Sequence, residues 1–211
     1  MPVIDDSAPN LLCLLLLAEL IVHSTCRPAG GAALCTNLKS MLHQVDRLIG
    51  LSSKLHGLSD EEVLIIARME NSLDSLPHLQ HSAEYFRSLQ VNESFSQLYL
   101  QTESFRQHVD WLKRAQDNCS LPSQAARSSS AHLLQLSKLL DASLQQMDQA
   151  VPQAPLPSFP VVSSSFEVLQ FSVEISDQLT VLSCRWRSCT GLRRTAREVS
   201  KMPTFTVRLL K

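Results

Sequence analysis

The chain has 211 residues, of which 44% are apolar and 18% are charged, and its net charge is −1. This balance is typical of one globular domain and excludes a disordered chain, while the small net charge gives the whole chain no bulk attraction to nucleic acid or to an anionic membrane. With five glycines and no strand-length run of alternating apolar and polar residues, the sequence predicts an all-α protein.

An apolar block near the N-terminus, residues 11–22, is interrupted only by Glu19. It is too short to span a bilayer, which takes about 20 residues, but it has the length of a signal-peptide core. Two aspartates precede the block where a signal peptide favours positive charge, so a buried first helix is the alternative. We expect residues 1–24 to be a signal peptide and residues 25–211 to be a secreted, extracellular domain.

The cysteines and the N-glycosylation sequons also bear on the expectation of secretion. Six cysteines are present, and removal of Cys13 with the signal peptide would leave an odd number, so at least one would be free or would pair with another chain. Sequons for N-glycosylation begin at Asn92 and Asn118. Helix capping is the alternative role for Asn92.

Four long helices are predicted, because apolar residues recur every three or four positions. Their expected ranges are 35–55, 92–115, 130–151 and 165–198. Gly57 marks the end of the first helix. Ser59 and Glu62 then form a capping-box pattern, which predicts a short extra helix inside the first connection.

The lengths of the connections predict the topology. A link over residues 116–123 reaches at most about 26 Å, whereas the second helix is about 36 Å long, so the second and third helices should be antiparallel. The proline-rich link 152–164 is expected to be extended and to reach about 40 Å, and the first link is longer still. Two long crossovers and one short turn predict a long-chain four-helix bundle with up-up-down-down topology.

Nothing in the sequence indicates an enzyme or a cofactor. It has no Gly-rich phosphate loop and no nucleophile with an ordered base, and no mixture of basic and aromatic residues suggests stacking on nucleic acid. His78, His81 and Glu84 have a spacing that would let them face a metal ion, but no third strong ligand accompanies the two imidazoles. We therefore expect no catalytic, cofactor-binding or metal site.

The C-terminal segment, residues 185–211, carries six Arg and two Lys against Glu198, which is a net charge of 8 − 1 = +7. One interpretation is favourable charge at the end of the last helix. The other is a docking surface for an acidic receptor or a sulfated glycan.

Two sequence blocks resemble the interleukin-11 family. They are "NSLDSLPHLQHSA" at residues 71–83 and "FRQHVDWLKRA" at residues 105–115. In that family an LDSLP loop precedes the second helix, and this helix ends with a histidine–valine pair, a tryptophan and basic residues. A Leu-rich third helix, a proline-rich crossover and the late Trp186 continue the resemblance, while the cysteines and the longer first crossover depart from it.

The resemblance implies a secreted cytokine of the interleukin-6 group. Such a cytokine binds an alpha receptor and then the shared transducer, glycoprotein 130, which activates Janus kinases and STAT signalling. The alpha-receptor face combines the end of the first crossover with the C-terminal part of the last helix. Its implied contacts here are Leu76, Pro77, Leu79, His81, Arg185 and Arg187.

Two further faces are implied for the transducer. The second face lies on the first and third helices, where Gln135 and Leu139 occupy contact positions, although Gln135 replaces a basic residue. The third face uses an aromatic residue at the start of the last helix. The family has a tryptophan there, and "SSSF" places Phe166 at that position, which keeps a large apolar anchor without the indole N–H.

The leucines of the LDSLP block admit two roles. Leu73, Leu76 and Leu79 can pin the first crossover onto the bundle, or some of them can remain exposed for a partner. An intracellular helical adaptor without catalytic activity is the alternative function for the whole chain.

Overall fold

The computed structural model describes residues 29–68, 72–77 and 91–188, and these residues are helical apart from their connections. The four long helices are α2 (Ala29–Ser52), α5 (Val91–Asn118), α6 (Gln124–Gln146) and α7 (Ser165–Ser188), and the short helix α3 (Asp60–Ile66) lies in the first crossover. The all-α prediction is confirmed. The segment 1–24 and the expected end of the last helix beyond Ser188 lie outside the described residues.

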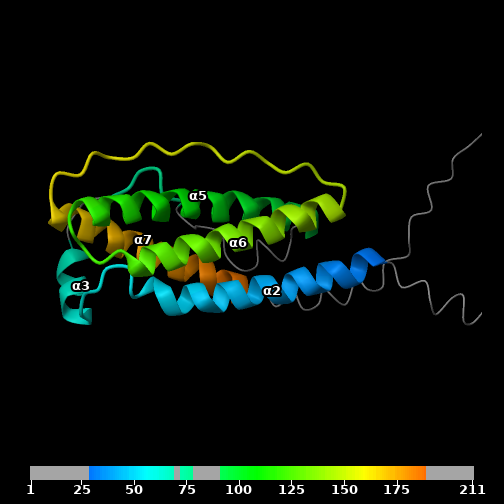
Figure 1. Cartoon of the computed structure of the whole chain (residues 1–211), viewed down its shortest axis with the longest axis horizontal. Helices are drawn as coiled ribbons and strands as arrows, with labels where there is room; N and C mark the ends of the chain where they lie inside the picture. Colours follow the sequence, from blue (N-terminus) through cyan, green and yellow to red (C-terminus); the bar gives the residue numbers. More distant parts are fainter. Residues whose placement is uncertain (1–28, 69–71, 78–90, 189–211) are drawn as a thin grey trace, which may run out of the picture.

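The helices run up-up-down-down, as predicted. Figure 1 shows α2 and α5 running one way along the bundle and α6 and α7 returning. Side-chain contacts agree: Asn37 bonds to Ser143 and Gln44 to His132, so residue numbers rise on α2 while they fall on α6. Each long helix packs against two others, which places α2 diagonally across from α5.

Some helix bounds differ from those expected. Helix α2 begins at Ala29, before the expected start at residue 35. Helix α6 covers Gln124–Gln146 and not 130–151, because it begins directly after the Pro122 turn and ends where Asp148 takes a φ of 54°. Of the residues that follow, Met147 and Val151 still pack against the core without being helical.

The capping box predicted for the short helix is present. The Ser59 hydroxyl accepts a hydrogen bond from the Glu62 backbone N–H, and the Glu62 carboxylate accepts one from the Ser59 N–H. This pair satisfies two N–H groups that a helix start otherwise leaves unpaired. Gly57, with a φ of 65°, turns the chain between α2 and α3, a conformation that glycine adopts without steric cost.

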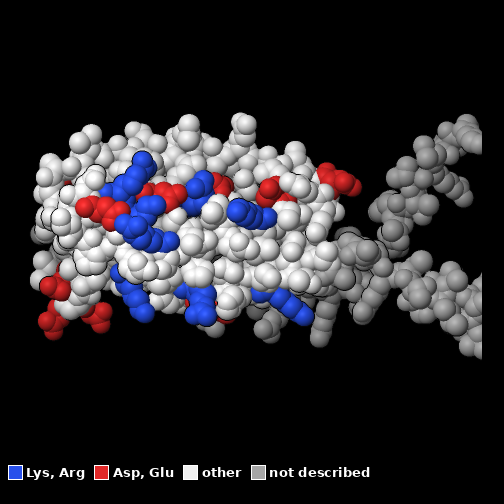
Figure 2. Space-filling view, viewed as in Figure 1, with Lys and Arg blue, Asp and Glu red and all other residues white. Residues whose placement is uncertain are grey.

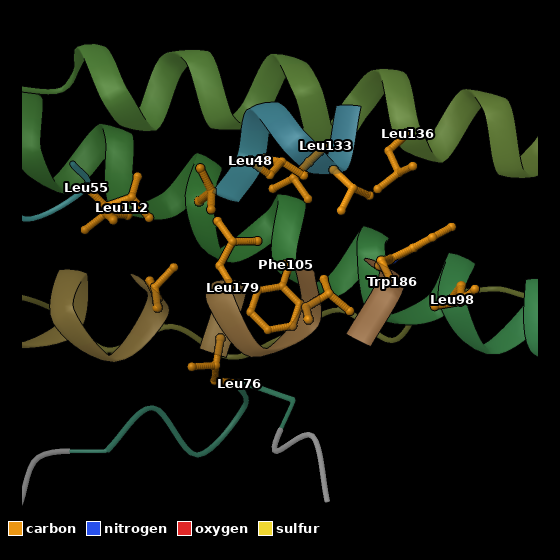
Figure 3. Close-up of a cluster of buried hydrophobic side chains, with 14 of the residues drawn as sticks. Leu48, Leu55, Leu76, Leu98, Phe105, Leu112, Leu133, Leu136, Leu179 and Trp186 are labelled. Atoms are coloured by element: carbon orange, nitrogen blue, oxygen red, sulfur yellow. The ribbon is translucent and has the colours of Figure 1, made fainter. Parts of the chain in front are cut away.

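One continuous core fills the bundle. Its largest fully buried side chains come from all four long helices and from the first crossover (Figure 3), and they include Trp186, Phe95, Phe105, Met41, Leu48, Leu112, Leu133 and Leu76. The apolar stripes read from the sequence are therefore core faces, since burial of such stripes is what stabilises helices of this length in water.

The second crossover, residues 152–164, runs extended along the bundle from the end of α6 to the start of α7 (Figure 1). It is held by Phe159, whose ring stacks on Trp111 with centroids 5.4 Å apart and meets His108 edge-on at 5.2 Å. Trp111 in turn meets Phe171 of α7. The aromatic contacts thus attach a proline-rich segment to α5 and α7.

Candidate functional site: three surfaces of a helical bundle

The first surface surrounds the LDSLP segment at residues 72–77, which is anchored to α7. The backbone N–H of Leu73 donates to both carboxylate oxygens of Glu174, at 3.2 and 2.9 Å, and the Ser72 hydroxyl donates to one of them. The Leu76 N–H donates to the Leu73 carbonyl at 2.8 Å, which closes a turn. The segment is therefore a fixed part of the bundle surface.

Leu73 and Leu76 are packing residues in this structure. Each side chain is only 2% exposed, and Figure 3 shows Leu76 pointing from the crossover toward Phe105 and Leu179. Two roles were open to these leucines, and both Leu73 and Leu76 take the first of them: they pin the crossover onto the bundle. Pro77, the next residue of the predicted alpha-receptor face, is half-buried and therefore still reaches the surface.

The other members of the predicted alpha-receptor face are placed only in part. Leu79 and His81, like the metal candidates His78 and Glu84, lie outside the described residues. Arg185 and Arg187 belong to the last turn of α7, on either side of Trp186, and the Trp186 side chain is buried in the core. The LDSLP segment is tied to α7 by Glu174, which lies in the first half of the helix, whereas Arg185 and Arg187 lie in its last turn.

The second surface is formed by α2 and α6. Gln135 is exposed on α6, and Leu139 follows one turn later, half-buried against the core. His132 bonds to Gln44 of α2 at 2.7 Å. Burial lowers the pKa of His132, and the positive charges of Arg47 and His43 lower it further. Figure 2 shows Lys and Arg side chains along α2 and, above them, over α6 and the neighbouring α5.

The third surface lies at the start of α7, where Phe166 is 47% exposed. Its helix is capped by Ser164, whose hydroxyl accepts a hydrogen bond from the Glu167 N–H, while the Glu167 carboxylate accepts bonds from the Ser163 and Ser164 backbone N–H groups. These bonds lower the pKa of Glu167, the Ser163 backbone bond most. Because both ends of this turn are tied, the Ser-rich approach fixes the start of the helix that carries the aromatic ring.

Helix α3 adds two exposed apolar residues that the sequence analysis missed. Leu64 is 63% exposed and Ile65 is 60% exposed, while the neighbouring Ile66 is buried. Helix α3 packs against α7 at the same end of the bundle as Phe166 (Figure 1). A signal was present in the run "VLII", which exceeds what one face of a two-turn helix can bury.

The sequons differ in their surroundings. The Asn92 side chain is half-buried and donates to Gln149 at 3.4 Å, whereas Asn118 is exposed at the end of α5. Cys119, which follows Asn118, is half-buried, and Cys184 is exposed on α7. Among the described helices none is both long and apolar enough to cross a membrane.

Comparison with protein-family models shows to which family the chain belongs. The family model for interleukin 11 matches residues 28–193, which is most of the chain and includes all the described helices. The chain belongs to the interleukin-11 family. A search of curated proteins finds no match, and neither does a search of solved structures. Interleukin-11 family members are non-enzymatic cytokines and are typically secreted.

Proposed function

We propose that the chain is a secreted cytokine that binds an interleukin-11-type alpha receptor and then glycoprotein 130, and so triggers Janus kinase and STAT signalling. The observation that carries the proposal is the family match over residues 28–193. A bundle with separate exposed surfaces suits a protein that works by bringing receptor chains together, because each receptor needs its own surface.

The alpha receptor is assigned to the first surface, with Pro77, Leu79, His81, Arg185 and Arg187 as its contacts. Leu76 acts from beneath this surface, since its side chain is buried. Glu174 supports the assignment because it fixes the LDSLP segment onto α7, the helix that also carries Arg185 and Arg187. A segment held in this way loses little conformational freedom when a receptor binds.

Glycoprotein 130 is assigned to the second and third surfaces. On the second, Gln135 and Leu139 lie one helical turn apart on α6. On the third, Phe166 is the aromatic anchor, and Leu64 and Ile65 of α3 extend the apolar area at that end. Aromatic residues, Phe included, are enriched at protein interfaces, where a few large side chains carry most of the binding energy.

The proposal is tested first by direct binding. The purified mature chain is mixed with soluble alpha-receptor and transducer ectodomains, and capture of both in one complex is the expected result. In mammalian cells, secretion into the medium with an enzyme-removable glycan on Asn118 is expected. A cytosolic product without glycan, bound by neither ectodomain, would contradict the proposal and favour the adaptor alternative.

A second test separates the surfaces. Phe166→Ala should leave alpha-receptor binding unchanged and weaken signalling in a reporter cell by about 30-fold, as expected for a hot spot worth about 2 kcal/mol. Leu156→Ala is the matched control, because Leu156 is 91% exposed but lies in the second crossover and is not one of the residues assigned to the third surface. Equal signalling by the two variants would show that the third surface is misplaced.

A further inference from the structure

At the second crossover, apolar residues stand directly before prolines. In the stretch "VPQAPLPSFP", residues 151–160, this holds for Val151, Ala154, Leu156 and Phe159. A peptide bond to proline is a poor protease substrate, because the ring replaces the N–H of the bond and restricts the residue before it. The bond between Val161 and Val162 is the first in this segment that follows an apolar residue other than proline without that protection.

The Val161–Val162 bond is also accessible. Val161 is 98% exposed, the highest value among the exposed large apolar side chains of the described residues, whereas Val162 is half-buried. Figure 1 shows the crossover running along the outside of the bundle. No hydrogen bond joins the backbone of either valine to another residue in the part of the chain that the structure describes. The backbone at this bond is therefore available to pair with a protease.

The other exposed apolar side chains do not offer a comparable bond. Those that belong to the described helices are Leu64, Ile65, Leu134, Phe166 and Val181. A protease binds its substrate as an extended strand, so a helix would have to unwind before cleavage. Leu156 is 91% exposed and lies in the crossover, but Pro157 follows it.

The residues around the bond indicate the class of protease. The Val161 side chain is short and apolar, which suits a serine protease with a small apolar S1 pocket of the elastase type. Pro160, directly before it, has its φ fixed at about −65°, which is compatible with an extended bound strand. Residues 152–164 contain no Lys or Arg, so a trypsin-type protease finds no site in this crossover.

Contacts on both sides limit access to the bond. On one side the Phe159 ring stacks on Trp111, with centroids 5.4 Å apart. On the other side the Ser163 backbone N–H donates to the Glu167 carboxylate at 2.7 Å. A bound protease needs several residues on each side of the bond in extended form, so at least one of these contacts has to open first. The rate of cleavage should therefore follow local opening and should rise when the Phe159 ring is removed.

We propose that the Val161–Val162 bond is a regulatory cleavage site for an elastase-type serine protease, and that cleavage weakens the third surface. In this hydrolysis the bond between the Val161 carbonyl carbon and the Val162 nitrogen breaks. The carbonyl carbon takes the oxygen of one water molecule and becomes a carboxylate, and both hydrogens of that water end on the Val162 nitrogen. The effect on signalling rests on the assignment of glycoprotein 130 to the third surface.

Cleavage acts on the third surface through the start of α7. The new amino terminus, Val162, lies four positions before Phe166, and an α-amino group with a pKa of about 7.7–8.0 is mostly protonated at about pH 7. This positive charge opposes the partial positive charge of the helix N-terminus. The cut also separates Ser163 and the Glu167 cap from the Phe159 anchor. The aromatic residue is then presented on a less ordered turn, while the LDSLP segment is untouched.

Limited digestion of the full mature chain with pancreatic elastase tests the site. A fragment with the N-terminal sequence VSSSF identifies a cut after Val161, and trypsin in parallel should give no such fragment. The two parts should elute together in size-exclusion chromatography, because buried residues such as Ile175 and Leu179 keep α7 in the core. The cut chain should keep its alpha-receptor affinity and lose signalling severalfold.

Three variants make the test specific. Val161→Asp places a charge where the pocket needs an apolar side chain, so the cut should disappear, and the exposure of this position leaves the fold intact. Leu156→Asp is the matched control, because it puts the same charge on another exposed residue of the crossover, and it should be cut like the unmodified chain. Phe159→Ala should be cut faster. Val161→Asp treated with the same elastase also controls for cuts elsewhere and should keep its signalling.

Absence of the VSSSF fragment from the digested chain would overturn the cleavage site, and so would its formation at an equal rate in Val161→Asp. Full signalling by the cut chain would overturn the regulatory role. A chain that binds neither receptor ectodomain, yet is cut after Val161, would overturn the proposed function and leave the cleavage site standing.

Discussion

Leu76→Ala tests whether the LDSLP segment contributes packing from below or direct receptor contacts. The substitution removes three carbon atoms from a side chain that is fully inside the core, next to Phe105 and Leu179. At about 0.8 kcal/mol for each buried methyl or methylene group, the lost transfer energy is about 2.4 kcal/mol. The residual cavity adds to this, so the free energy of unfolding should fall by about 3 kcal/mol.

The assay is urea unfolding followed by circular dichroism, with Leu64→Ala as the matched control. Leu64 is largely exposed, so the same chemical change should alter stability by less than about 0.5 kcal/mol. At low urea, where Leu76→Ala is still folded, the loss of receptor affinity should be smaller than for a change at Pro77. A Leu76→Ala variant of unchanged stability that no longer binds receptor would refute the packing argument.

Three other changes test the contacts that shape the bundle. Phe159→Ala removes the ring stacked on Trp111 and should cost on the order of 2 kcal/mol in urea unfolding, with earlier proteolysis in the second crossover; no change would mean that the aromatic contact does not hold it. Ser164→Ala removes the cap of α7 and should cost about 1 kcal/mol by thermal unfolding, whereas an equal Tm would show that the cap is idle. Burial raises the pKa of Glu103, but hydrogen bonds, chiefly from Arg106, outweigh burial and leave this pKa below its ordinary value of 4.5. The stability that Glu103 contributes should therefore be complete above about pH 4.5 and should be lost as the pH falls further. Glu103→Gln should make the acid-induced loss of stability less steep in an acid titration.

The contribution of the sequence is clearest in the helices. Apolar residues such as Leu133, Leu136 and Leu140 recur at the helical period, and this spacing alone places them on one face. The Ser59 and Glu62 capping box was equally readable, because its partners lie within one turn of each other. Chain length also restricted the topology, since a short link cannot return along a long helix.

The candidate surfaces depended on contacts that no local pattern contains. Leu64 and Leu76 both lie in the first crossover, yet one is exposed and the other is buried. The same holds for His108, whose partners Ser75 and Ser158 come from the two crossovers.

The sequence by itself determined that the chain forms amphipathic helices, where one of them is capped, and to which family it bears a likeness. Only the tertiary structure decided which leucines of the first crossover face inward and which residues meet around His108. The physical reason is the separation of the interacting residues along the sequence. Helical periodicity and capping act over a few residues. Burial and hydrogen bonding in a crossover depend on helix residues that are more than thirty positions away, as His108 is from Ser75.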